Sequence, residues 1–243
     1  MNHKSIDKRR GIHFLPHLFT SASLFSGFFA IITGFNRNFV LAAICICLSA
    51  VMDTIDGRVA RLTNTQSPFG AEYDALADIV SFGVAPALII YFWAFKNLHQ
   101  LGSVVAFIYL ASVALRLARF NTHLEDNSSL NRLYFNGLPS PASAVTIAAL
   151  VWLFNNIGYA NSSKWVSLLT TIITLYLSTM MMSSIHFKSL NNYNLKGKII
   201  KKLVLIIFSI TIMLIEPSVA LFSIFMFYAL SGIFSVIYSK YSK

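Results

Sequence analysis

Charged residues and cysteines are both scarce in this chain of 243 residues. Asp, Glu, Lys and Arg make up 12% of the sequence, against about 25% in an ordinary soluble domain, which excludes a highly charged disordered chain. The two cysteines, Cys45 and Cys47, lie inside an apolar stretch and would point to different sides of a helix, which excludes a disulfide framework and a cysteine-based metal site. Linker-like runs of turn residues are also missing, so we expect one domain over residues 1–243.

Long apolar segments are what the chain has instead. It is 56% hydrophobic with a mean hydropathy of +0.66. A segment of about 20 apolar residues spans a bilayer, and this length predicts an all-α, polytopic transmembrane helical bundle of about eight spans. The predicted spans are Leu18–Phe35, Phe39–Arg58, Phe69–Phe95, Gly102–Phe120, Ala142–Tyr159, Trp165–Ser184, Ile199–Ile215 and Val219–Tyr238. Residues 1–15 are then a basic juxtamembrane segment, 16–184 a catalytic six-helix core and 199–238 a C-terminal helical hairpin.

The distribution of Lys and Arg predicts the topology, because cytoplasmic ends of spans collect basic residues. They gather before the first span, after the second, fourth and sixth, and at the C-terminus. Both termini should therefore face the cytoplasm. The formal charge of +10 is spread over one membrane face, which favours attraction to anionic lipids over nucleic-acid binding. The basic N-terminus is followed by a long apolar stretch without a cleavage site, so we expect a retained first span, preceded by a short interfacial helix.

Four aspartates, Asp53, Asp56, Asp74 and Asp78, lie at the end of the second predicted span and the start of the third. Helical geometry places Asp53 and Asp56 on one face, and Asp74 and Asp78 on another that can meet it across a short connection. Pro68 suits the first turn of the second of these helices. Four carboxylates in a membrane protein repel one another unless cations compensate them. Oxygen ligands of this kind suit two Mg²⁺ or Mn²⁺ ions, an arrangement typical of phosphoryl transfer.

Two readings compete with a metal site. A buried charge network balanced by Arg58 and Arg61 would leave carboxylates in excess. A transporter or channel could also place carboxylates in the membrane. A transporter or channel would not need the small and basic residues that accompany the aspartates, namely Gly57, Ala60, Arg61 and Gly70. Together with the aspartates these residues form the pattern D-x2-D-G-x2-A-R-x8-G-x3-D-x3-D.

This complete pattern resembles the signature of the CDP-alcohol phosphatidyltransferases, integral membrane enzymes that move a phosphatidyl group from a CDP-linked lipid to an alcohol. The resemblance implies that Asp53, Asp56 and Asp74 bind metal and that Asp78 is the catalytic base and also touches metal. It also implies a CDP-binding set formed by Asp56, Gly57, Ala60, Arg61 and Gly70. It implies a homodimer. The distribution of Lys and Arg places the aspartate motif, and so the active site, on the cytoplasmic side, and we expect the membrane to be a bacterial inner membrane. The residue pattern alone supports metal binding but does not single out Asp78 as the base.

Two further segments bear on the acceptor alcohol. The sequence S81-F-G-V-A-P86 follows the last aspartate, and R116-L-A-R-F-N121 is followed by F135-N-G-L-P-S-P-A142. This combination resembles the membrane-integrated phosphatidylserine synthases, which join L-serine to the phosphatidyl group of CDP-diacylglycerol. An arginine fork binds a carboxylate well, so Arg116 and Arg119 are candidates for serine binding, with Asn121 and Ser140 as helpers. The alternative is that the arginines anchor a helix end, and glycerol 3-phosphate, an inositol phosphate or choline stays open as the acceptor.

Overall fold

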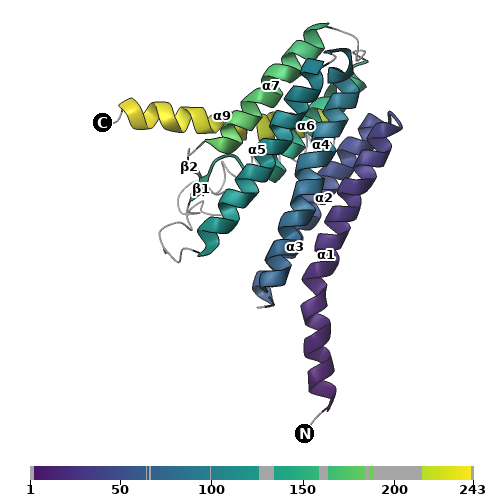
Figure 1. The fold of residues 1–243 in the computed structure, drawn as a ribbon, viewed down its shortest axis with the longest axis vertical. Helices are drawn as coiled ribbons and strands as arrows, with labels where there is room; N and C mark the ends of the chain where they lie inside the picture. Colours follow the sequence, from purple (N-terminus) through teal and green to yellow (C-terminus); the bar gives the residue numbers. More distant parts are fainter. Residues whose placement is uncertain are drawn as a thin grey trace.

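The structure is a computed structural model, and it describes residues 3–63, 65, 67–98, 100–125, 134–158, 164–183, 186–188 and 215–241. Most of these residues are helical, as expected for an all-α protein (Figure 1). The helices in chain order are α1 His3–Phe35, α2 Phe39–Leu62, α3 Pro68–Asp78, η1 Ile79–Val84, α4 Ala85–Ile90, η2 Tyr91–Phe95, η3 Lys96–Leu98, α5 Gln100–Glu125, α6 Ser140–Asn156, α7 Lys164–Met182 and α9 Pro217–Tyr241. The strands β1 Tyr134–Asn136 and β2 His186–Lys188 form a short antiparallel pair.

Five helical segments are long and apolar enough to cross a membrane. They are Pro16–Phe35, Phe39–Leu62, Pro68–Phe95, Gln100–Phe120 and Lys164–Met182, which correspond to five of the predicted spans. The predicted span Ala142–Tyr159 corresponds to α6, which has only 17 residues. The predicted span Ile199–Ile215 lies almost entirely outside the described residues. The last predicted span falls in α9, whose apolar part Pro217–Gly232 is shorter than the five. The total of eight spans and the orientation of the termini stay predictions.

The N-terminal segment is part of α1 and not a separate interfacial helix. The helix runs without interruption from His3 to Phe35 and contains Pro16. Its first turns extend well beyond the neighbouring helices (Figure 1). From Pro16 onward α1 packs along α2, α3 and η1, so one helix lines both segments that carry the aspartates.

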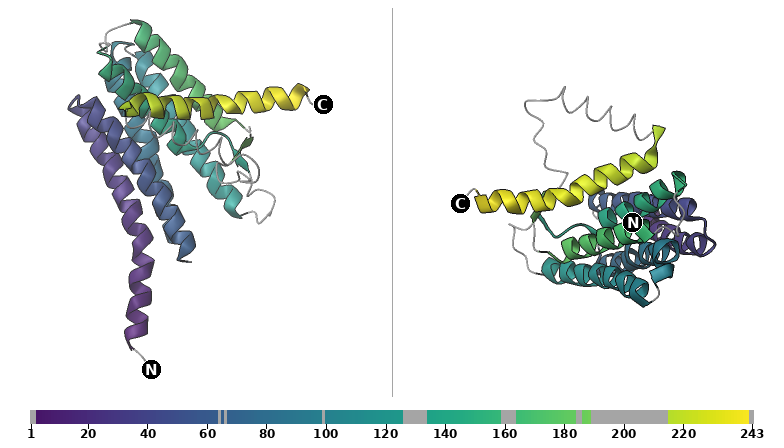
Figure 2. Two further views of the ribbon diagram at one scale, coloured as in Figure 1. Left: turned by 180° about the vertical axis from the view of Figure 1, so that it is seen from behind. Right: turned by 90° about the horizontal axis from the view of Figure 1, so that it is seen from above.

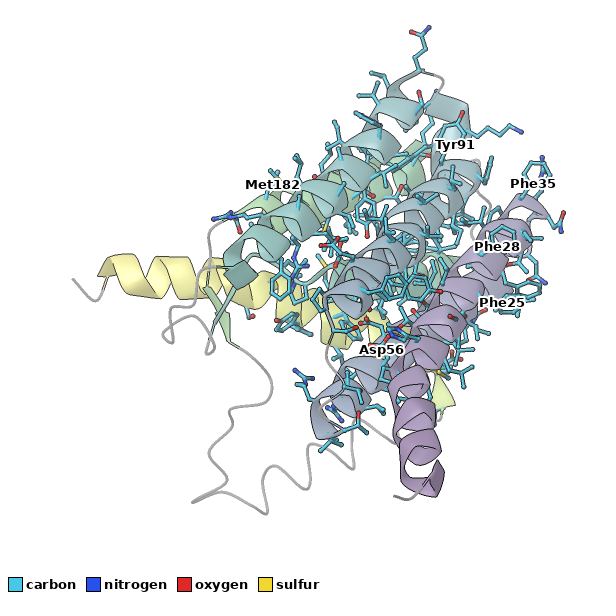
Figure 3. The ribbon with its side chains drawn as sticks, turned by 60° about the horizontal axis from the view of Figure 1, so that its bottom comes forward. Phe25, Phe28, Phe35, Asp56, Tyr91 and Met182 are labelled. Carbon is cyan, nitrogen blue, oxygen red and sulfur yellow. The ribbon has the colours of Figure 1, made fainter. Side chains whose placement is uncertain are left out.

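The centre of the bundle is α6, which packs against α2, α9 and the segment from η1 to α4. Every residue from Ala142 to Val151 is buried. A helix that is apolar and small-sided all round is suited to such a position, because it can approach neighbours on every side. On the outside of the bundle, Phe25, Phe28 and Phe35 project away from α1 (Figure 3).

Candidate active site

Three of the four aspartates converge at the junction of α2 and α3. Asp53 and Asp56 come from α2 and Asp74 from α3, and each offers a carboxylate oxygen such that the three oxygens lie within 4.8 Å of one another. Asp56 is only 5% exposed, and Figure 3 places it inside the bundle beside α1. The predicted meeting of the two faces is therefore confirmed for these three residues.

The start of α3 explains why so short a connection can bring the two helices together. Ser67 caps the helix by accepting a hydrogen bond from the Gly70 N–H at 3.0 Å. Pro68 occupies the first turn, where its missing N–H costs no hydrogen bond. The helix thus begins immediately after the connection, and Asp74 reaches the level of α2's last turns.

Asp78 ends α3 and lies next to the other three aspartates. Its side chain interacts electrostatically with those of Asp53, Asp56 and Asp74. It also interacts electrostatically with Arg116 on α5. A π-helical segment, η1, begins at the next residue, and π-helical turns often accompany functional sites because they change the direction of side chains. Tyr109 of α5 donates a hydrogen bond of 3.1 Å to the Phe82 carbonyl within η1 and so holds this segment against α5.

Two residues of α1 interact with Asp56, and neither was predicted to take part in the site. The Thr20 hydroxyl donates a hydrogen bond to Asp56 Oδ2 at 2.5 Å. His17, one turn earlier, interacts electrostatically with the same carboxylate. A sequence feature that could have indicated their role is the recurrence of polar residues along one side of this apolar helix, at Thr20, Ser23 and Ser26.

A seam of small residues fixes α1 against the helices that carry the aspartates. The hydroxyls of Ser23 and Ser49 lie 2.8 Å apart, and Ser26 donates to the Cys45 carbonyl at 2.8 Å. A Cβ added at Gly27 would stand 2.7 Å from Ser81 Cα, closer than real side chains approach a backbone. Small residues such as glycine and serine are therefore needed in this seam, because larger side chains would keep α1 from packing this closely against α2 and η1.

The residues expected to bind CDP lie around the aspartates. Gly57 and Ala60 are half-buried on α2, and Arg61 is exposed one turn from Gly57. A Cβ at Gly57 would meet only Arg61 Nη2, at 3.9 Å, so the space beside Gly57 is open. Gly70 differs, because a Cβ there would lie 3.1 Å from both His17 Cε1 and Ser67 Oγ. Gly70 thus makes room for the His17 ring and the helix cap.

The structure describes the side chains of three of the four residues expected to bind serine, Arg116, Arg119 and Ser140. Arg116 is half-buried, and its Nη1 donates a hydrogen bond to Ser140 Oγ at 3.1 Å. Ser140 is fully buried at the first position of α6. Arg119 is exposed. Asn121 falls within α5, but its side chain lies outside the described residues. Arg116 and Ser140 are therefore the two that come together, and Arg116 also interacts electrostatically with Asp78.

The turn before α6 explains the position of Ser140. Gly137 has φ of 82°, and a Cβ there would stand 2.5 Å from the Met181 carbonyl oxygen, so a side chain is excluded on both grounds. The next residue, Leu138, is fully buried and its N–H donates to the Met180 carbonyl at 3.1 Å. The turn is thus hydrogen-bonded to the end of α7, and this position places Ser140 within hydrogen-bonding distance of Arg116.

The sequence model of the CDP-alcohol phosphatidyltransferase family matches residues 13–177, a stretch that includes every residue of this site. The chain belongs to that family. Among curated relatives, the CDP-diacylglycerol–serine O-phosphatidyltransferase of Helicobacter pylori is 35% identical over 223 residues, covering 91% of this chain and 90% of the relative. The protein of the same name from Methanocaldococcus jannaschii is 33% identical over 210 residues, covering 85% and 90%. That from Saccharomyces cerevisiae is 35% identical over 167 residues, covering 62% and 59%.

The donor set at the junction of α2 and α3 fits a hard divalent cation. All three converging side chains supply carboxylate oxygens, the ligands that Mg²⁺ and Mn²⁺ prefer. Their negative charges are close together and Asp56 is buried, so a cation would relieve their mutual repulsion. The aspartates are thus suited to metal binding in a family of phosphotransferases.

Proposed function

We propose that this protein transfers the phosphatidyl group of CDP-diacylglycerol to the hydroxyl of L-serine, giving phosphatidylserine and CMP. One observation carries the choice of acceptor: Arg116 lies beside Asp78, hydrogen-bonded to the buried Ser140. The Arg116 guanidinium, a group suited to binding a carboxylate, is thus an electrostatic neighbour of Asp78, the last aspartate of the motif. The relatives from three organisms are named for the same reaction.

In this proposal Asp53, Asp56 and Asp74 hold two Mg²⁺ or Mn²⁺ ions, with Asp78 as a further ligand. When bound, the ions would neutralise negative charge on the pyrophosphate as CMP departs. Thr20 supports this set by holding Asp56 in one orientation, since its hydroxyl donates to a single carboxylate oxygen.

Asp78 acts as the base. It accepts the proton of the substrate hydroxyl while the hydroxyl oxygen forms a bond to the phosphatidyl phosphorus. The bond from that phosphorus to the oxygen of CMP breaks, and CMP carries away the electron pair. Asp78 interacts electrostatically with the other three aspartates, which supports placing the base in the same cluster that receives the nucleotide.

The nucleotide lies over Gly57 and Ala60, where the structure has little side-chain bulk. Arg61 binds a phosphate of CDP-diacylglycerol through two hydrogen bonds. Gly70 contributes by keeping the start of α3 close to His17. The two glycines thus act differently: Gly57 leaves space for a ligand, and Gly70 allows His17 and Ser67 to approach the start of α3.

The experiment that tests the proposed function is an acceptor panel with labelled CDP-diacylglycerol and purified protein. L-serine should give phosphatidylserine and stoichiometric CMP. Glycerol 3-phosphate, inositol phosphate and choline should give little product. Equal or faster transfer to one of these alcohols would overturn serine as the acceptor, and absence of CMP release with every acceptor would overturn the reaction.

We further propose that the whole chain, residues 1–243, works as one domain in the bacterial inner membrane, as a homodimer, with the active site facing the cytoplasm. The five apolar helices support membrane integration. The aspartates and Arg116 come from the helix ends where Lys and Arg gather in the sequence, which supports the cytoplasmic placement.

A further inference from the structure

The π-helical segment that follows Asp78 is held from two sides by buried hydrogen bonds. This segment, η1, lies between α1 on one side and α5 on the other (Figure 1, and from behind in Figure 2). Toward α5, the hydroxyl of Tyr109 donates to the Phe82 carbonyl at 3.1 Å. Toward α1, the hydroxyl of Ser81 donates to the Ser23 carbonyl at 3.2 Å. Tyr109 and Ser81 are both fully buried, so water does not compete for either bond.

Close packing on both sides also limits movement of η1. A Cβ added at Gly83 would lie 3.0 Å from Leu110 Cδ1 and 3.4 Å from Val113 Cγ1, both on α5. On the other side, Gly27 of α1 lies directly against the backbone of Ser81. Because π-helical turns are rare and occur mostly as short interruptions of α-helices, such a turn depends on the contacts around it. The two hydrogen bonds and the two glycines supply those contacts.

The π-helical turn sets the orientation of Asp78 relative to the rest of its span. Asp78 is the last residue of α3, and Phe82 follows it by about one turn. Within η1 the Ala85 N–H bonds to the Val80 carbonyl, five positions back, whereas an α-helix bonds four positions back. If η1 returned to α-helical pairing, α3 would rotate about its axis relative to α4. The Asp78 carboxylate would move with it.

Tyr109 lies on the side of α5 that also carries Arg116. The two residues are seven positions apart, about two helical turns, so their side chains leave α5 in similar directions. Arg116 reaches Ser140, whereas Tyr109 reaches the backbone of η1. The hydrogen bond from Tyr109 therefore fixes the segment after Asp78 against the helix that carries the group proposed to bind the acceptor.

We propose that Tyr109 and Ser81 are positioning residues for Asp78: from α5 and within η1 they hold the π-helical turn that orients the Asp78 carboxylate toward the acceptor hydroxyl. This inference rests on the proposed function, because it takes Asp78 as the base. Both hydroxyls act through the backbone of η1 and of α1, and neither touches a substrate.

The test begins with Tyr109→Phe, which removes the hydroxyl and keeps the ring in the core. Loss of one hydrogen bond lowers the population of the competent turn by at most the equivalent of that bond, so kcat should fall by about 2- to 12-fold. The KM values for serine and CDP-diacylglycerol should stay within about twofold of the parent, because the change affects the chemical step. Single turnover of bound, labelled CDP-diacylglycerol with saturating serine should show the same fall.

Ser81→Ala tests the turn from the α1 side. The Ser23 carbonyl also accepts a hydrogen bond of 3.0 Å from the Ser49 hydroxyl, so this variant leaves no buried carbonyl unsatisfied. It should therefore fold, and it keeps the inference testable if Tyr109→Phe does not fold. Its kcat should fall within the same range of about 2- to 12-fold, again with both KM values near those of the parent.

The matched control is Tyr176→Phe. Tyr176 on α7 likewise donates to a helix carbonyl, that of Ala229 on α9 at 2.9 Å, so the same kind of bond is lost at an interface that does not include η1. Its kcat should stay within about twofold of the parent. An equal fall of kcat in the control, or a joint rise of both KM values in Tyr109→Phe, would indicate a structural role and overturn the inference. A parental kcat in Tyr109→Phe or in Ser81→Ala would overturn the role of that residue.

Failure of the proposed function gives a different result. Asp78→Asn in the same single-turnover experiment tests the base by itself. If Asp78→Asn keeps the parental rate, Asp78 is not the base and both assignments fall. If Asp78→Asn loses activity whereas Tyr109→Phe and Ser81→Ala keep the parental rate, only the positioning role falls.

Discussion

Thr20 on α1 donates a hydrogen bond of 2.5 Å to Asp56 on α2, across 36 positions of sequence. This contact links the first span to the proposed metal site. The hydrogen bond occupies Asp56 Oδ2 and so leaves Oδ1 to face a cation. Hydrogen-bond partners of metal ligands orient those ligands in the same way in other proteins.

Thr20→Val should therefore weaken metal binding without removing a ligand. We expect the Mg²⁺ concentration for half-maximal activity to rise by about 10-fold, at the lower end of the effect of losing such an outer partner. The control is Thr54→Val on α2, because the exposed Thr54 hydroxyl bonds only to the Ala50 carbonyl in the described residues. A parental Mg²⁺ requirement in Thr20→Val would contradict the role of Thr20.

Removal of divalent metal should abolish turnover, because the three converging carboxylates lack a compensating cation without it. The measurement is CMP release in the presence of a chelator, followed by addition of excess Mg²⁺ or Mn²⁺. Activity should return with either ion. Full activity in the chelator would show that the aspartates work without metal.

Asp53→Asn and Asp78→Asn should both lose activity, but in different ways. Loss of a ligand in Asp53→Asn should raise the metal requirement and weaken nucleotide binding, whereas loss of the base in Asp78→Asn should lower kcat by about 100-fold or more with substrate KM values less affected. Steady-state kinetics over a range of Mg²⁺ concentrations distinguish the two. Near-parental kcat in Asp78→Asn at neutral pH would remove Asp78 as the base.

The two candidate arginines should differ in their effect on serine. Arg116→Ala should raise the serine KM by about 10- to 150-fold, since a charge-assisted hydrogen bond contributes about 1.5–3 kcal/mol. Arg119→Ala should have a much smaller effect, because Arg119 is exposed whereas Arg116 lies beside Asp78. Serinol, which lacks the carboxylate, should be a poor acceptor for the parent and no worse for Arg116→Ala. The reverse order of the two arginines would contradict the assignment.

Gly27→Ala should destabilise the bundle by about 1–3 kcal/mol, the usual cost of overpacking. The added methyl group would collide with the Ser81 backbone and separate α1 from η1. Thermal unfolding in detergent measures the effect, with Ala22→Leu as the control at an exposed position of the same helix. Equal stability of Gly27→Ala and the parent would mean that α1 can move away from η1 at little cost in free energy.

Local sequence determined most of the helical architecture and the core of the site. Five predicted spans correspond to helices because a run of about 20 apolar residues is a property of neighbouring residues alone. The convergence of Asp53, Asp56 and Asp74 followed from helical spacing and a short connection that begins with a cap at Ser67. These features need no information from distant parts of the chain.

Tertiary packing decided the rest. Arg116 and Arg119 are equivalent by spacing, and only the tertiary structure makes Arg116 the partner of Ser140 on α6 and an electrostatic neighbour of Asp78 on α3. Thr20 stands far from the aspartate motif in sequence, and it reaches the site because α1 packs against α2 and α3, the helices that carry the motif. Contacts between distant segments depend on how side chains fit at each helix interface, which periodicity and composition do not specify.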